Sequence, residues 1–209
     1  MVIRLLLCAF LLIPWPTPAY QYAFPPEPLP VELSDEQNST LERTGMVKGL
    51  QQDDNRGEAW LVMDLEIEPD RLWAVILAFQ RYSDRVESME SSRLVKQDVL
   101  DDHQLIWVDY ELARFWVSLN YRLVHEYWPA KSYLRWTLDP EHKNDLDSVD
   151  GYWHLQPHPT RPGWSRVYYG ARLTAFDWLP NWVQNLLAQD GLDTTSHWLK
   201  GAVNDQNPL

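Results

Sequence analysis

A single early helix pattern followed by a long run of strand patterns narrows the folds open to this chain. Apolar and polar residues alternate along 60–67, as in a half-buried strand. Pro69 then opens a segment whose apolar residues recur every three to four positions over 72–79, the spacing of a helix. Six further strand patterns follow at Ser92–Val99, Gln104–Ala113, Val117–Trp128, Ser132–Asp139, Val149–Pro157 and Arg166–Ala175. Because their connections are short, we expect an antiparallel meander.

A second helical pattern closes the chain. It begins at Leu179-Pro180, carries an apolar stripe through Leu186 and Trp198, and is interrupted by Gly191. The order strand, helix, about six strands, helix segregates the helices from the sheet. The sequence therefore predicts an α+β fold, with a curved antiparallel sheet of about seven strands wrapped around a long C-terminal helix.

Residues 1–19 have the order of a secretory signal peptide. Arg4 precedes an unbroken apolar run from Leu5 to Ile13, and Thr17-Pro18-Ala19 offers small residues for cleavage. The run is about half the length of a membrane-spanning helix. We expect a mature protein that begins near Tyr20, is periplasmic or secreted, and does not stay inserted in a membrane. The alternatives are an uncleaved anchor or a wrongly assigned start of the chain.

Composition excludes several classes of partner. The formal charge of −12 becomes −13 once the segment with Arg4 is removed, so nucleic acid should be repelled. Cys8, the one cysteine, lies in that same segment, so the mature chain has no disulfide. Residues 20–44 form a proline-rich acidic leader, in which Ser34 and Gln37 predict a capping box for a helix that ends near Gly45. Residues 45–209 form the folded domain, whose oligomeric state the sequence leaves open.

Several segments resemble the START-like, or SRPBCC helix-grip, superfamily, which includes polyketide cyclases and coenzyme Q-binding proteins. The resemblance lies in Ile67–Leu77, in Val86–Leu94, in Asp150–Pro157 and in the helix that starts at Pro180, and it covers roughly residues 45–203. The resemblance implies an apolar cavity between a curved sheet and a C-terminal helix. Members of the superfamily mostly bind lipids or other hydrophobic molecules, and a minority catalyse reactions on them.

The 12 tryptophans of the chain supply candidates for the walls of such a cavity. Alternation along the strands places Trp136, Trp153 and Tyr169 on the apolar faces of their strands, which makes them the strongest candidates. Leu134, Leu155 and Tyr121 share those faces, and Leu186 and Gly191 come from the closing helix. The alternative is that these large rings fill the interior and leave no cavity.

No constellation of residues points to catalysis, to a metal or to a cofactor. The sequence has no nucleophile elbow and no glycine-rich phosphate loop. Alternation places His125 toward the interior and His154 on the opposite face, and a lone strand histidine is more often structural than a ligand. Arg122, Arg135 and Arg172 fall opposite the apolar faces, where we expect them to pair with acids.

Three functions stay open at this stage. The leading hypothesis is an exported protein that binds a hydrophobic small molecule, a lipid or quinone-like compound, without transforming it. The second is a cyclase or dehydratase that uses the same cavity. A buried His125 with a perturbed pKa would support this second function. The third is an envelope interaction module whose proline-rich leader captures a partner.

Overall fold

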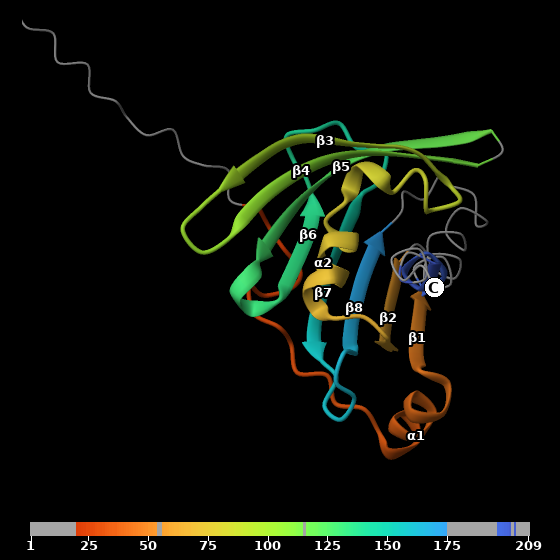
Figure 1. The fold of residues 1–209 in the computed structure, drawn as a ribbon. Coiled ribbons are helices and arrows are strands. Elements are labelled where there is room, and N and C mark those ends of the chain that lie inside the picture. The colour runs from red at the N-terminus through yellow and green to blue at the C-terminus, as the bar shows by residue number, and fades with distance from the viewer. Residues whose placement is uncertain (1–19, 54–55, 115, 175–195, 202, 204–209) are drawn as a thin grey trace, which may run out of the picture.

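The structure, a computed structural model, describes residues 20–53, 56–114, 116–174, 196–201 and 203. One strongly curved antiparallel sheet makes up most of it (Figure 1). Its strands are β1 (Met46–Asp53), β2 (Arg56–Leu65), β3 (Met89–Val99), β4 (Gln104–Arg114), β5 (Val117–Trp128), β6 (Tyr133–Leu138), β7 (Ser148–Pro157) and β8 (Ser165–Thr174). They lie in the order β1-β2-β8-β7-β6-β5-β4-β3. The predicted meander is confirmed from β3 to β8, because each strand in that series pairs with the next.

The sheet has eight strands, so the prediction of about seven was one short. The missing strand is β1, which pairs with β2 at one edge of the sheet. Its sequence, with Gly49 and the polar pair Gln51-Gln52, shows no strong alternation of apolar residues. An edge strand needs only one neighbour and little burial, so backbone pairing with β2 is enough to form it.

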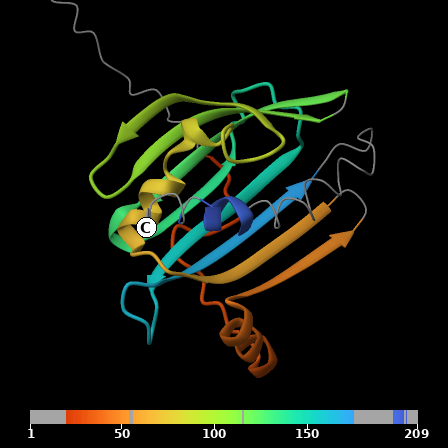
Figure 2. The same cartoon turned by 45° about the vertical axis from the view of Figure 1, so that its right-hand side comes forward.

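Helix α2 (Pro69–Ile76) packs against the concave face of the sheet (Figure 1). Pro69 opens it, as predicted, and Leu72, Val75 and Ile76 are completely buried. A short 3-10 helix, η1 (Phe79–Arg81), continues the chain toward β3. Residues 196–201 are helical and lie across the same concave face in Figure 2. The rest of the predicted closing helix falls outside the described residues, and so do Leu186 and Gly191.

Three aromatic rings on the sheet lie over a glycine of a neighbouring strand. Trp60 pairs with Gly49, Trp136 with Gly151, and Tyr152 with Gly170. A Cβ atom built on any of these glycines would overlap the facing ring. A ring that lies flat over a glycine buries more of its surface than it could over a side chain. Gly151 therefore sets the position of Trp136 on the concave face.

The leader is folded onto the convex face of the sheet. Phe24 packs edge-on against Tyr152 with 4.9 Å between ring centroids, and the backbone N–H of Ala23 donates to Asp150 over 3.0 Å. Arg135 donates to the carbonyl oxygen of Phe24 over 2.7 Å. Helix α1 (Asp35–Thr44) follows, and its capping box and the left-handed Gly45 at its end confirm the prediction for that helix.

Ion pairs cover the convex face, as the alternation predicted. Arg122 pairs with Asp109 over 2.6 Å, and the guanidinium Nε of Arg135 donates to Glu126 over 2.8 Å. Arg172 pairs with Glu58 over 3.1 Å. The two faces of the sheet are therefore chemically separate: charged side chains are paired on the outside, and aromatic side chains gather on the inside.

Candidate functional site

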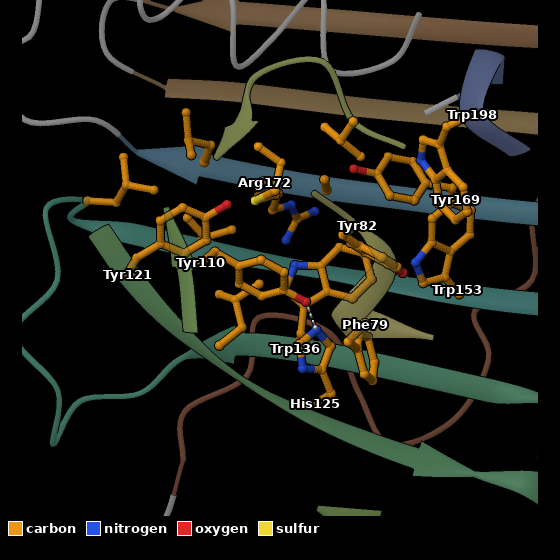
Figure 3. A pocket seen from close by; sticks show the side chains of 17 residues that line it. Phe79, Tyr82, Tyr110, Tyr121, His125, Trp136, Trp153, Tyr169, Arg172 and Trp198 are labelled. Carbon is orange, nitrogen blue, oxygen red and sulfur yellow. Dashed lines mark hydrogen bonds between the residues drawn. The ribbon is translucent and has the colours of Figure 1, made fainter. Parts of the chain in front are cut away.

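A cavity of about 220 Å³ lies on the concave face of the sheet (Figure 3). Six strands, β3 to β8, contribute to its wall, together with the segment that connects α2 to β3, the loop before β7 and the helical residues 196–201. Its lining residues are Phe79, Tyr82, Val86, Met89, Tyr110, Tyr121, Leu123, His125, Trp136, Leu146, Val149, Trp153, Tyr169, Ala171, Arg172, Leu173 and Trp198.

A cluster of large rings forms one side of the cavity. Trp153 lies 4.5 Å from Tyr169 and 6.4 Å from Trp136, measured between ring centroids. Trp198, from the helical residues 196–201, meets Tyr82 at 5.3 Å and Trp153 at 6.5 Å. These contacts hold the rings in tilted and edge-on arrangements, which aromatic pairs prefer. The rings thus form an aromatic wall in which each ring packs against another.

His125 and Tyr110 place a polar pair inside this apolar wall. The ring of His125 is 4.4 Å from that of Phe79 and 6.2 Å from that of Trp136. The hydroxyl of Tyr110 lies 3.4 Å from Nε2 of His125, and Nδ1 of the same ring lies 3.3 Å from the carbonyl oxygen of Ile106. Figure 3 shows the tyrosine hydroxyl directed at the imidazole among the lining side chains.

Burial shifts both members of the pair toward their neutral forms. It lowers the pKa of His125 from 6.5 to about 3, because the imidazolium would lose its hydration inside the protein. Burial also raises the pKa of Tyr110 well above its usual value of 10. At neutral pH the cavity therefore presents two uncharged hydrogen-bonding groups.

Arg172 borders the cavity, but its guanidinium group contacts residues of the convex face. Its guanidinium pairs with Glu58 and stands 4.9 Å above the ring of Phe24, which packs on the convex face. The sheet thus separates this positive charge from the interior. Among the described residues no cluster of three metal-binding side chains is found, and no helix there is long and apolar enough to cross a membrane.

Solved structures similar to this chain share one architecture. A fragment of a STAR-related lipid transfer protein from Xanthomonas axonopodis matches with a TM-score of 0.60 and 15% identity, over 77% of this chain and 94% of that one. A START superfamily protein from Mycobacterium smegmatis matches with a TM-score of 0.55 and 11% identity, over 78% and 99%. The Zhui aromatase/cyclase from Streptomyces sp. R1128 gives 0.53 and 12%, over 72% and 93%.

The chain has a START-like helix-grip fold. No protein-family model and no curated protein matches its sequence. At identities of 11–15% the likeness establishes the START-like fold and leaves the function to be argued from the site.

The START-like fold brings together four of the residues that the sequence nominated for the cavity wall. Trp136, Trp153, Tyr169 and Tyr121 all line the cavity, and their role as ligand contacts stays a prediction. Leu134 and Leu155 share the apolar face but lie in the closed part of the core, completely buried and outside the lining. Alternation gives the face of a strand and not the position along it, so it could not separate these two groups.

Several lining residues were not nominated from the sequence. Phe79 and Tyr82 come from the turn after α2, Tyr110 from β4, and Trp198 from the C-terminal segment. Tyr110 could have been found, because it falls on the apolar face of its strand opposite Asp109. The chain path that folds Phe79 and Tyr82 over the sheet has no such local signal.

The lowered pKa of His125 predicts an acid-dependent loss of stability. Below pH 6.5 the unfolded histidine takes up a proton, whereas the folded one stays neutral down to about pH 3. The stability that depends on a neutral His125 is therefore complete above 6.5 and falls as the pH decreases through this window. In urea denaturation from pH 7 to pH 4, we expect His125→Leu to lose stability less steeply than the wild type, by about 1 kcal/mol per pH unit. Parallel curves for the two proteins would contradict this assignment.

Proposed function

We propose that this protein is an exported binding protein that holds a hydrophobic small molecule, lipid-like or quinone-like, in the cavity on the concave face of its sheet. The observation that carries the proposal is the aromatic wall, in which Trp136, Trp153 and Tyr169 form one side of a cavity of about 220 Å³. A mostly apolar cavity with a few polar groups is the usual form of a small-molecule site. Export rests on the order of residues 1–19 alone.

The START-like fold supports binding as the function but does not select a ligand. One structural neighbour is named as a lipid transfer protein and another as an aromatase/cyclase. Binding is favoured here because His125, the group that a cyclase would use as a base, has a pKa of about 3. A general base works best when its pKa lies near the operating pH. His125 is therefore suited to hydrogen bonding rather than to proton abstraction.

A role of the leader in capturing a partner receives less support. Its residues Ala23, Phe24 and Pro25 are engaged by side chains of the same chain, through Asp150, Arg135 and Tyr133. A partner would have to compete with these contacts. The leader is therefore better explained as a part of the folded domain that covers the convex face.

Native mass spectrometry of protein purified after export is the direct test. We expect a co-purifying apolar molecule at near-stoichiometric occupancy, which denaturing extraction would release for identification. Protein that is folded, empty and unable to bind any hydrophobic probe would contradict the proposal. A ligand that is released chemically altered would point to the cyclase-type function instead.

A cavity-filling variant links the bound molecule to this site. Ala171 belongs to β8 and lines the cavity on the concave face. A phenylalanine at this position would project into the cavity. We expect Ala171→Phe to reduce ligand occupancy roughly tenfold or more, because the added ring and the ligand would overlap. Val99→Phe, at a β3 position that is 73% exposed, adds the same ring away from the cavity and should leave occupancy unchanged. Equal occupancy in both variants would place the ligand elsewhere.

A further inference from the structure

A chain of hydrogen bonds with a fixed direction reaches the cavity. It starts at the carbonyl oxygen of Ile106, which can only accept, so Nδ1 of His125 must be the nitrogen that carries the proton. His125 is neutral, and its other nitrogen, Nε2, is then an acceptor. The backbone of β4 therefore decides which tautomer of the imidazole faces the cavity.

The next group in the chain is Tyr110. Its hydroxyl donates its one proton to Nε2 of His125 over 3.4 Å. What the tyrosine oxygen can still offer is a lone pair, which accepts a hydrogen bond. Tyr82, another lining residue, has likewise given its proton to the carbonyl oxygen of Ile76 over 2.7 Å. Both hydroxyls are therefore acceptors for a bound molecule and not donors.

The charges around the cavity exclude an anionic ligand. Arg172 is the cationic residue in the described lining, and its guanidinium is bound to Glu58 and covered by Phe24 on the convex face. A carboxylate or phosphate that entered the cavity would lose its hydration and meet no free positive charge there. Such a transfer is strongly unfavourable.

The volume of the cavity indicates how large a part of a ligand it can surround. An engineered cavity of about 150 Å³ in another protein holds one benzene molecule. The 220 Å³ measured here is therefore suited to one or two rings. It is below the roughly 300–1,000 Å³ of sites that take drug-sized ligands, and because the cavity is open on one side it surrounds only part of a larger molecule.

We infer that the cavity selects a neutral compound of one or two rings that carries a hydroxyl group, and that this hydroxyl donates a hydrogen bond to the oxygen of Tyr110. The inference rests on the proposed function and narrows its ligand class. A hydroxylated ring extends the chain through Tyr110 and His125 to Ile106 with every group satisfied. A carbonyl-bearing ring in the same place against Tyr110 would require Tyr110 to withdraw its proton from His125, which would leave Nε2 buried and unpaired.

Four naphthalene derivatives of similar size test the inference by isothermal titration calorimetry. They are 2-naphthol, which donates; 2-methoxynaphthalene and 2-acetylnaphthalene, which only accept; and 2-naphthoate, which is anionic. At a pH where naphthol is neutral, we expect it to bind roughly two- to tenfold more tightly than either acceptor compound, the ratio that one hydrogen bond contributes. We expect 2-naphthoate to bind most weakly.

Variants of the hydrogen-bond chain then assign the preference to Tyr110. Tyr110→Phe should bind naphthol and methoxynaphthalene equally, because the acceptor is gone. Tyr121→Phe removes another lining hydroxyl that has no place in the chain, and it should keep the preference for naphthol. His125→Leu frees the proton of Tyr110, so the preference should shift toward 2-acetylnaphthalene. The preference is measured as the ratio of two affinities within the same variant. This ratio does not require the variants to be equally stable.

The results separate this inference from the function on which it rests. If the wild type binds the acceptor compounds or 2-naphthoate as tightly as naphthol, the hydroxyl preference is overturned while the binding function stands. If Tyr121→Phe loses the preference and Tyr110→Phe keeps it, the assignment to Tyr110 is overturned. If none of the four compounds binds to folded protein, the inference is overturned, and the native mass spectrometry described above decides separately whether the proposed function stands.

Discussion

Replacing Gly151 with alanine is expected to lower the free energy of unfolding by about 3 kcal/mol, at the upper end of the cost of overpacking a core. The added Cβ would overlap the indole of Trp136 and come within 2.7 Å of the carbonyl oxygen of Gly170. The carbonyl belongs to the sheet and cannot move away without breaking strand pairing, so the indole has to move. It would move toward the cavity, and we therefore expect Gly151→Ala to weaken ligand binding as well.

Urea denaturation and the occupancy of the cavity measure the two effects on the same protein. Gly201→Ala is the matched control, because among the described residues no atom outside its own helical segment lies within 4 Å of a Cβ built there. Gly201 is exposed in the helical residues 196–201, so alanine should be neutral or stabilising by up to about 1 kcal/mol. If Gly151→Ala is as stable as Gly201→Ala, the ring of Trp136 is not held by contact with Gly151.

The second large effect is expected at Asp64, where asparagine should cost about 3–5 kcal/mol of unfolding free energy. The side chain of Asp64 has no exposed surface and binds Arg166 through both carboxylate oxygens, at 2.8 and 3.0 Å. His158 donates from Nε2 to the same carboxylate over 3.0 Å, since its Nδ1 accepts the backbone N–H of Arg161. Removal of the negative charge would leave the guanidinium of Arg166 largely buried without its counter-ion.

Asp84 offers the control for this prediction. It pairs with Arg81 over 3.9 Å at a site where both side chains are about two-thirds exposed. Asp84→Asn should change the unfolding free energy by no more than about 0.5 kcal/mol. Raising the salt concentration should leave the large loss at Asp64 nearly unchanged, because buried pairs are poorly screened. If Asp64→Asn lowers the unfolding free energy as little as Asp84→Asn does, the Asp64 cluster does not stabilise the fold.

Strand alternation predicted the two faces of the sheet because one face meets polar groups and water, whereas the other meets the apolar interior. Trp136 was expected on the apolar face and Arg135 opposite to it, paired with an acid, and the structure places them so. The helix at Pro69 and the capping box at Ser34 were predictable for a similar reason, since each depends on residues within one turn. Local chemistry determines these features, so a single sequence is enough to reveal them.

Features that depend on distant parts of the chain were not predictable in this way. Strand β1 forms because β2 pairs with it, and its own residues carry little signal. Leu134 and Trp136 alternate identically, yet one lies in the closed core and the other lines the cavity, because the path of α2 and η1 decides where the interior is filled. The sequence analysis separated the leader from the folded domain, whereas its packing against Tyr152 and Asp150 depends on strands far along the chain.

The ring cluster on the concave face also has a spectroscopic consequence. Trp136, Trp153 and Trp198 lie within 6.5 Å of a neighbouring tryptophan and are fixed at angles to one another. At such separations the electronic transitions of the indoles couple, which gives strong near-ultraviolet circular dichroism and fast exchange of excitation energy among the rings. A molecule that enters the cavity would lie against these rings and is expected to change their coupling. The near-ultraviolet circular dichroism of the unlabelled protein should therefore report whether the cavity is occupied.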